Sequence, residues 1–432
     1  MSKKRLIVIS QDALVFEDLE QLRKLPHFKI LMENGSMVET LRSIYPTVTY
    51  PAHVSMITGM YPNRHGVINN EELVIGELAS DWHWFRSSNK AETLFDAAKK
   101  AGMSTAAVFW PVTGNDPNID YLIAEYWSQG KDDTPREAFR RSGTNEELLE
   151  TVVDKHLPGL VERKHPQADV FILKCACDII EKYQPQLLCI HPAVIDDYRH
   201  KTGLFNDKVS EGLQLVDEWL GWIMEATRRA GVYDETNFVI MSDHGQLEIK
   251  RIMNPNVILR DHGLITVDDR EELADWQAYC KSAALSAQVY LKNPDDRTVY
   301  EKTYRLLCEM RDEGIYGISQ VFTREEINEL EHLDGDFSFV IETDGFTTFG
   351  NDWRRPLVRS FDTSDYRFGR ATHGHLPDKG PQPTMVVMGP DFAKSVVIKR
   401  RPIVDCASTF AKLLGLELPN ADGTCIQDIL AI

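Results

Sequence analysis

The chain has 432 residues, of which 43% are hydrophobic and 26% are charged, and its formal net charge is −18. This composition is typical of a globular protein and excludes a fibrous or largely disordered chain. The negative charge excludes a general electrostatic attraction to nucleic-acid polymers or anionic membranes, whereas a small phosphorylated ligand needs only a few local cations. At this length we expect either one large domain with an insertion or two domains that share a cleft.

The cysteines and the N-terminal segment predict a cytoplasmic protein. Seven cysteines are scattered along the chain, and their odd number suits a reducing compartment. The first apolar run, Leu6–Ser10, is too short for a signal sequence or a membrane span. We therefore expect no membrane association, and the sequence leaves the oligomeric state open.

Short β-branched runs alternate with helical patterns, which predicts an α/β fold with a mostly parallel central sheet flanked by helices. The expected buried strands are Leu6–Ser10, Thr105–Trp110, Leu187–His191, Asn237–Met241 and Thr384–Met388. Helical spacing marks residues 91–102 and 209–230, and the polar segment 130–144 is expected to be a loop.

The segment 254–370 has a different composition from the rest of the chain. It contains strand-like runs at 287–292 and near Phe337, and a helical pattern at 299–311. We expect it to be a smaller α+β cap inserted into a catalytic core of residues 1–253 and 371–432. Substrate choice is expected to depend on this cap.

Polar residues beside the predicted strands are candidates for a binding site, because ligands bind beyond the carboxyl ends of parallel strands. Three carboxylates and three imidazoles qualify, namely Asp12, Asp196, His200, Asp243, His244 and His373. Zn²⁺ takes imidazole nitrogen and carboxylate oxygen, and two such ions can activate a nucleophile and stabilise a leaving oxygen. A lone Asp after a strand usually caps a helix, so the prediction of a two-metal site depends on all six residues converging.

The tripeptide Asp-His-Gly occurs twice, and only the first copy follows an apolar strand run. The second, Asp261–Gly263, ends a segment in which Asn254 or Asn256 could cap a short helix that Gly263 closes. We assign the first copy to metal binding and the second to structure.

The segment Ser43–Val67 is rich in hydroxyl groups and includes PTVTYP. A threonine attacks phosphorus only when a metal ion or a base gives it alkoxide character. Pro51 is expected to begin a helix, so Thr49 would lie near a helix N-terminus, whose dipole and free N–H groups favour phosphate. Thr47 is an alternative nucleophile. The non-catalytic alternative is that the segment is a turn stiffened by prolines, in which the threonines only form capping hydrogen bonds.

Several motifs carry a resemblance to a known family: PTVTYPAH, MITGMYPNRHGVINN, DDYRH, SDHG and ATHGH, preceded by Asp12. Together they resemble the nucleotide pyrophosphatase/phosphodiesterase family of the alkaline phosphatase superfamily, over positions 12–375. The resemblance implies an alkaline-phosphatase-like core and two in-line displacements through a phosphothreonine on Thr49. It also implies one zinc ion held by Asp12, Asp243 and His244 with Thr49 coordinated to it, and another held by Asp196, His200 and His373.

The resemblance further implies that Asn70 donates a hydrogen bond to a non-bridging phosphate oxygen together with the backbone N–H of Tyr50. Tyr50 matches an aromatic residue that stacks on a nucleobase, with Tyr126 or Trp127 as candidate partner. The chain departs from the family pattern at Ala52, where Asn is usual, and at Arg199, where Gly is usual. Arg199 is therefore expected near the second metal ion, where it could contact substrate.

These features predict a metal-dependent phosphodiesterase or nucleotide pyrophosphatase acting on a small phosphorylated substrate, with nucleotides among the candidates. The expected cofactors are two divalent ions, Zn²⁺ or else Mn²⁺. The alternative is a phosphonoacetate-type hydrolase or a phosphomonoesterase of the same superfamily. A monoester needs an additional cation, for which Arg64, Arg199 or a cap lysine are candidates, whereas Asn70 fits a diester better. A non-catalytic binding protein is disfavoured, because each ligand triad leaves a coordination position open.

Overall fold

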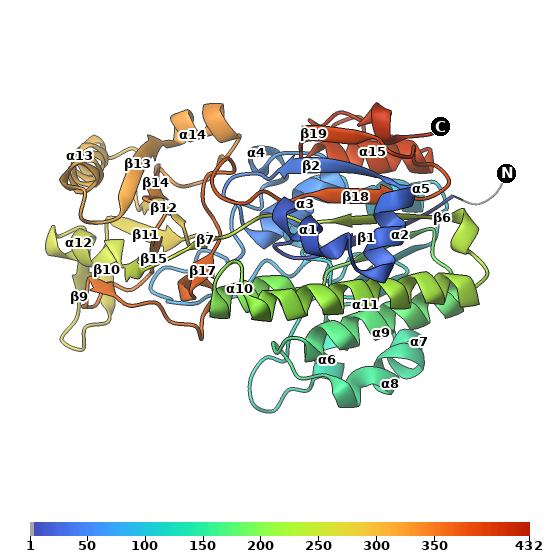
Figure 1. The fold of residues 1–432 in the computed structure, drawn as a ribbon. Coiled ribbons are helices and arrows are strands. Elements are labelled where there is room, and N and C mark those ends of the chain that lie inside the picture. The colour runs from blue at the N-terminus through green and yellow to red at the C-terminus, as the bar shows by residue number, and fades with distance from the viewer. Residues whose placement is uncertain (1–3) are drawn as a thin grey trace.

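The computed structural model describes residues 4–432 and is organised around one eight-stranded sheet (Figure 1). Its strands are, in spatial order, β19 (Val397–Pro402), β2 (Ser36–Arg42), β18 (Met385–Met388), β6 (Thr236–Met241), β1 (Arg5–Ser10), β5 (Leu187–Ile190), β3 (Thr105–Val108) and β4 (Tyr121–Ile123). Only β18 runs antiparallel to its neighbours; the other adjacent pairs are parallel. The predicted α/β fold with a mostly parallel sheet is confirmed, and all five predicted strands belong to this sheet.

Both faces of the main sheet are covered by helices, because successive side chains of a strand point to opposite faces. Ile7 and Ile9 of β1 pack with α2 (Pro26–Asn34), α9 (Gln167–Tyr183) and α11 (Asp207–Arg229). Leu6 and Val8 pack with α3 (Thr49–Thr58), α5 (Leu94–Lys100) and α15 (Asp405–Leu414). Burial on both faces explains why β1, β5 and β6 are apolar throughout rather than alternating.

The predicted helices at 91–102 and 209–230 correspond to α5 and α11. The segment 130–144, expected to be a loop, contains a further helix, α6 (Pro135–Arg141). Thr134 caps it by accepting a hydrogen bond from the Glu137 N–H at 3.3 Å. Because α6 buries only Ala138 and Phe139, its apolar periodicity is too short to predict a helix. The sequence feature that could have predicted its start is Thr134-Pro135 followed by the acidic Glu137. The remaining helices of the core are α1 (Leu19–Leu22), α4 (Pro62–His65), α7 (Glu146–Leu148), α8 (Asp154–His156) and α10 (Val194–Thr202).

A second lobe, defined here as the elements from β8 to β16, lies to the left of the main sheet in Figure 1. Its antiparallel sheet has the order β11 (Ala278–Ser282), β12 (Ser286–Leu291), β14 (Phe339–Thr343), β13 (Ile318–Thr323), with helices α13 (Arg297–Glu313) and α14 (Arg324–Glu331). Smaller elements are β8 (Arg251–Met253), β15 (Thr347–Phe349), β16 (Val358–Arg359), the hairpin β9 (Ile265–Val267) and β10 (Leu273–Trp276), and α12 (Pro255–Asp261). The expected strands near 287 and 337 and the helix at 299–311 are β12, β14 and α13.

The chain crosses between the two lobes through a short antiparallel pair, β7 (Leu247–Glu248) with β17 (Ala371–Thr372). Strand β8 pairs with β15 and β16 although it precedes residue 254. The division of the chain at 254 and 370 stays a prediction, and β8 shows that pairing with the inserted strands begins earlier. Among residues 4–432, no helix combines the length and the apolar character needed to cross a bilayer.

A buried ion cluster joins the second lobe to the loop that follows α4. Lys281 of β11 places its Nζ 2.7 Å from Glu71 Oε2 and 2.7 Å from Ser80 Oγ. The guanidinium of Arg367 lies 3.3 Å from Glu71 Oε1. The three charged side chains are at most 5% exposed, so their pairing holds together segments that are distant in sequence.

Replacing Lys281 by Met should lower the free energy of unfolding by about 3 kcal/mol, because removing one partner leaves buried charge uncompensated. Lys292→Met is the matched control, since Lys292 forms an exposed pair with Asp275 at 2.6 Å and should change stability by at most about 1 kcal/mol. Urea unfolding of both variants measures the difference. Equal small effects would contradict a structural role for the buried cluster.

Candidate active site

The six predicted metal ligands lie together at the carboxyl edge of the main sheet. Asp12 follows β1, Asp243 and His244 follow β6, and His373 follows β17. Asp196 and His200 lie one turn apart on α10, which begins shortly after β5. Because parallel strands end at the same edge of a sheet, the topology brings residues from four distant points of the sequence into one place.

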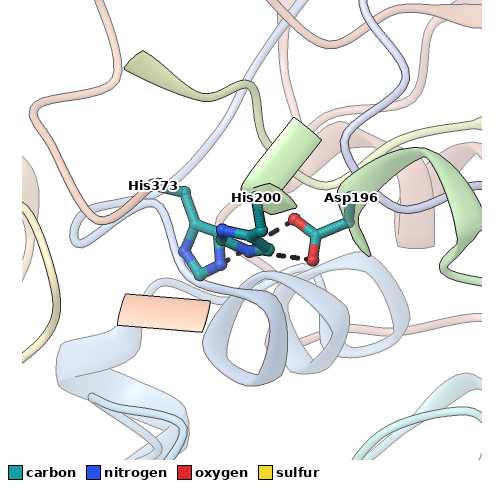
Figure 2. A group of neighbouring side chains, drawn as sticks. All are labelled: Asp196, His200 and His373. Carbon is teal, nitrogen blue, oxygen red and sulfur yellow. Dashed lines mark ion pairs between the residues drawn. The ribbon is translucent and has the colours of Figure 1, made fainter. Parts of the chain in front are cut away.

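Asp196, His200 and His373 form one cluster of ligand atoms (Figure 2). His200 Nε2 lies 2.9 Å from Asp196 Oδ2, and His373 Nε2 lies 3.9 Å from Asp196 Oδ1. On the other side of its ring, His200 Nδ1 is 2.7 Å from the carbonyl oxygen of Ala371. This backbone contact orients the ring so that Nε2 faces the carboxylate, as supporting hydrogen bonds do for metal-binding histidines.

A second cluster of ligand atoms, from Asp12, Asp196 and His244, shares Asp196 with the first. His244 Nε2 is 3.5 Å from Asp12 Oδ1 and 3.2 Å from Asp243 Oδ2. Asp243 is held in place by the backbone N–H of Ala13, which donates to Oδ1 at 3.2 Å. The structure therefore brings Asp12, Asp243 and His244 together as predicted, and Asp196 joins the two clusters into one centre.

Several buried polar atoms of this centre have no hydrogen-bond partner among the residues that the structure describes. They include Asp12 Oδ1, Asp243 Oδ2 and His373 Nδ1. Leaving carboxylate and imidazole atoms unpaired in a protein interior is energetically unfavourable. A divalent cation would satisfy oxygen and nitrogen donors at once, so the donor set fits metal ions that prefer mixed His and Asp ligands.

Burial sets the pKa shifts of Asp12, Asp243 and His244, whereas in the Asp196–His200 pair the mutual attraction outweighs burial, lowering the pKa of Asp196 and raising that of His200. Burial, reinforced by the neighbouring Asp196 and Asp243 carboxylates, raises the pKa of Asp12 well above its ordinary value. Burial also raises the pKa of Asp243 to about 7 and lowers that of His244 to about 3. The protein alone thus disfavours the charged forms of these groups, and cations in the site would restore the carboxylates to their ionised state.

Thr49 is the first residue of α3, and its Oγ1 lies 3.1 Å from His244 Nε2. The helix begins two residues before Pro51, because extended backbone ends at Val48. Thr47 is engaged elsewhere: its hydroxyl donates to the carbonyl of His375 at 2.9 Å and accepts from the Gly374 N–H at 3.0 Å. Of the two candidate nucleophiles, the structure places only Thr49 at the centre.

Asn70 lines the same cavity as Thr49, but its relation to Tyr50 differs from the expectation. The Tyr50 N–H donates to Asn70 Oδ1 at 2.8 Å, so it is not a second free donor, while Asn70 Nδ2 is buried without a partner. Pro51 has no N–H, so the first turn of α3 offers fewer free donors than predicted. Asn70 Nδ2 is the donor that this arrangement leaves available.

The side chain of Tyr50 does not reach the cavity, in contrast to its predicted role in base stacking. It is 0% exposed and packs in an apolar cluster with Val54, Val67 and Trp84. Successive residues of a helix project about 100° apart, so the position after Thr49 points away from the metal centre. Of the two candidate stacking partners, Trp127 lines the cavity and Tyr126 does not.

Arg199 also differs from its expected position near substrate. Its guanidinium is buried, with Nη2 2.6 Å from Asp18 Oδ1 and Nε donating to the Leu204 carbonyl at 3.0 Å. On a helix, the residue before His200 necessarily projects away from it. Arg64, the other core arginine considered for a monoester, pairs with Asp422 and does not line the cavity.

The second Asp-His-Gly has the structural role predicted for it. Asp261 is the last residue of α12 and lies 2.6 Å from Arg355 in an ion pair. Gly263 has φ +69°, the left-handed conformation that closes a helix. Asn254 occupies the N-cap position, although its side chain makes no capping hydrogen bond.

Sequence reasoning missed His191, which lines the cavity directly after β5. Its Nε2 lies 3.4 Å from Asp12 Oδ2, and its Nδ1 lies 3.1 Å from the Ser10 carbonyl. Its position at a strand end was the signal that could have identified it.

A cavity of about 360 Å³ opens over the centre and includes an aromatic wall, of which the sequence indicated only Trp127. This wall consists of Trp82, Trp84, Trp127 and Tyr366. The Trp82 and Tyr366 ring centroids are 5.3 Å apart, and Tyr366 stacks near His373 at 5.7 Å. No local pattern marked Trp82 or Tyr366, because both lie outside the main sheet strands and α helices and reach the cavity only through tertiary packing.

Comparison with known proteins gives a family match over most of the chain. The family model described as type I phosphodiesterase / nucleotide pyrophosphatase matches residues 6–356. An ectonucleotide pyrophosphatase/phosphodiesterase of Caenorhabditis elegans is 23% identical over 429 residues, covering 95% of this chain and 47% of the relative. Human ectonucleotide pyrophosphatase/phosphodiesterase family member 1 is 24% identical over 226 residues, covering 51% of this chain and 21% of the relative. The chain thus spans about half or less of the length of these relatives.

Solved structures with the same fold include two ectonucleotide pyrophosphatase / phosphodiesterase 5 proteins. An inactive variant of the murine protein in complex with AMP has a TM-score of 0.67 and 18% identity. The human protein has a TM-score of 0.68 and 17% identity, and each comparison covers 99% of this chain and 100% of the solved chain. At this identity the likeness establishes the fold, including the alkaline-phosphatase-like core that the sequence predicted.

The two Asp-His-Gly copies provide a matched test of metal binding. Purified protein should contain about two equivalents of transition metal by elemental analysis, and Asp243→Asn should lose at least half of it, because a buried ligand is removed. Asp261→Asn removes the same charge from a surface ion pair and should retain the metal. Less than about one equivalent in the parent protein, or equal loss in both variants, would contradict the site.

Proposed function

Because the chain belongs to the type I phosphodiesterase / nucleotide pyrophosphatase family, we propose that it is a metal-dependent hydrolase of phosphodiester or phosphoanhydride bonds. The observation that carries this proposal is the Thr49 hydroxyl, which lies 3.1 Å from His244 Nε2 beside a buried centre of Asp and His side chains. A nucleophile and a metal-binding donor set are thus adjacent in one cavity.

In the proposed mechanism, Thr49 is the nucleophile of two successive displacements. Its Oγ forms a bond to phosphorus as the bond from phosphorus to the leaving oxygen breaks, and water then hydrolyses the phosphothreonine and restores the hydroxyl. The positive end of the α3 dipole lies at Thr49 and favours the incoming anion. Asn70, whose Oδ1 is held by the Tyr50 N–H, directs its free Nδ2 toward a non-bridging oxygen.

The metal ions proposed for this site are two Zn²⁺, with Mn²⁺ as the alternative that the same ligands accept. Asp12, Asp243 and His244 would hold one ion beside Thr49, and Asp196, His200 and His373 would hold the other. When bound, such ions lower the pKa of a nucleophilic hydroxyl and neutralise phosphate charge. The unpaired buried oxygen and nitrogen atoms of these residues support this assignment.

The proposed substrate is a small phosphorylated molecule of the nucleotide type. The aromatic wall supports a ligand with a flat ring, since aromatic side chains stack on nucleobases. A cavity of about 360 Å³ is within the range of small-molecule sites. The murine relative whose structure was solved with AMP is consistent with this class of ligand.

We also propose a cytoplasmic location, as the cysteine content suggests. All seven cysteines are free thiols, and five of them are buried, which suits a reducing compartment. Fractionation of the producing cells tests this location, and accumulation of the protein in the medium would contradict it.

Turnover of bis-p-nitrophenyl phosphate and p-nitrophenyl phosphate tests the reaction class. The diester should be the better substrate, because Asn70 Nδ2, the neutral donor left free in the cavity, suits the smaller charge of a diester, and Arg64 and Arg199 are engaged in other ion pairs. A preference for the monoester would instead identify a phosphomonoesterase.

The threonine pair tests the nucleophile. Thr49→Ala should reduce turnover at least about a thousandfold while metal content is retained, because the attacking oxygen is lost. Thr47→Ala removes the same group two residues away and should keep most of the activity, with a stability loss of about 1 kcal/mol from its buried hydrogen bonds. Loss of activity in Thr47→Ala alone would reverse the assignment.

A further inference from the structure

We propose that Arg163, Lys164 and His165 form a subsite for a second anionic group of the substrate, the terminal phosphate of a nucleoside polyphosphate. These three residues, named here the basic loop, line the same cavity as Thr49 and Asp196. The proposal rests on the proposed function for the identity of the ligand. It adds a residue-level account of how a chain with a net charge of −18 can accept a highly anionic substrate.

The charges of the basic loop are largely available to a ligand. Lys201 also lines the cavity, but its Nζ lies 2.7 Å from Asp197 and is neutralised by it. Among residues 4–432, neither Arg163 nor Lys164 has an ion-pair partner within 4.0 Å. Unpaired arginine and lysine side chains that face a cavity are the groups that bind phosphate through charge-assisted hydrogen bonds.

Two anchors fix the basic loop relative to the metal centre. His165 Nδ1 lies 2.6 Å from Asp169 Oδ2 in the first turn of α9. The other oxygen of Asp169 accepts a hydrogen bond from the Ala193 N–H at 2.7 Å, directly before α10. Since α10 carries Asp196 and His200, one buried carboxylate connects the basic loop to the helix that holds metal ligands.

The anchoring carboxylate also keeps His165 cationic. Burial opposes protonation of this ring, but Asp169 outweighs it and raises the pKa of His165 to about 9. The other charged groups facing the loop are Glu125, Asp196 and Asp197. The positive charge of His165 is thus paired with Asp169, and the loop presents the Arg163 and Lys164 side chains to this wall of the cavity.

The backbone of Arg163 is held in an unfavourable conformation. Its φ is +55°, in the left-handed region that non-glycine residues rarely adopt. Such a conformation costs on the order of 1 kcal/mol and is concentrated at functional sites, where the surrounding structure maintains it. Gly or Asn would adopt this conformation more easily than arginine does.

The same cavity holds one element for each part of a nucleoside polyphosphate. The aromatic wall suits the base, Thr49 and the metal ligands suit the reacting phosphate, and the basic loop suits the phosphate beyond it. A competing explanation is that Arg163 only balances Glu125, a half-buried carboxyl. Desolvation by its surroundings raises the pKa of Glu125 to about 7, a shift that the Tyr50 hydroxyl and the Arg163 charge oppose. The two explanations predict different effects of the second phosphate on the affinity of the protein for a nucleotide.

The test compares binding of AMP and of α,β-methylene-ADP, which differ by the second phosphate group, to the metal-loaded protein by calorimetry. The parent protein should bind α,β-methylene-ADP more tightly. In the double variant Arg163→Gln with Lys164→Gln, the preference for α,β-methylene-ADP over AMP, measured as the ratio of the two dissociation constants, should fall by about tenfold or more. A loss of charge-assisted hydrogen bonds to the second phosphate accounts for this change. Arg305→Gln and Lys174→Gln remove the same charges from exposed positions outside the cavity and should leave the ratio unchanged.

Each outcome separates the explanations. An unchanged ratio in the double variant, or equal weakening of both nucleotides, overturns the subsite and leaves Arg163 as a partner of Glu125. Failure of the parent protein to bind either nucleotide also overturns it. If the parent protein shows the preference and the double variant loses it, but bis-p-nitrophenyl phosphate and ATP are not hydrolysed, the subsite stands and the proposed hydrolytic function fails.

Discussion

The central constraint in this structure is the burial of several carboxylates within a few ångströms of one another without enough protein cations to balance them. Asp12 and Asp243 lie at the edge of the main sheet, where burial raises their pKa values and lowers that of the neighbouring His244, while Asp196 pairs with His200. A protein interior does not stabilise such a group of acids by itself. The buried donor atoms without hydrogen-bond partners therefore form a candidate metal-binding centre, and Thr49 lies beside it.

The second lobe contacts the core beside the site through an apolar cluster that includes Tyr45 and Phe337, and through a buried ion cluster. Glu71 follows Asn70 in sequence, and Arg367 follows Tyr366, so the buried cluster with Lys281 lies directly behind two cavity residues. Because one ion cluster holds the residues next to Asn70 and Tyr366, the position of the second lobe and the shape of the cavity depend on each other. The predicted influence of the inserted segment on substrate choice thus has a physical route, through Tyr366 and the loop that carries Asn70.

The residues expected to contact substrate were predicted less well than the metal ligands, and the reason is geometric. Tyr50 and Arg199 were each adjacent in sequence to a residue of the centre, but adjacent positions on a helix project in different directions. The Tyr50 side chain therefore packs in an apolar cluster, and the Arg199 guanidinium forms an ion pair with Asp18. The side chains that do line the cavity, such as Trp82 and Arg163, come from loops without a periodic pattern.

The sequence by itself predicted the α/β fold, its buried strands and the six candidate metal ligands, because ligands of a parallel sheet bind beyond the carboxyl ends of its strands. It also separated the two Asp-His-Gly copies, since only one follows a strand. Of the two threonines, the tertiary structure places only Thr49 at the centre, since Thr47 donates to the His375 carbonyl and accepts from the Gly374 N–H. It alone supplied the aromatic wall and the basic loop, because these arise from packing between segments that no local pattern connects.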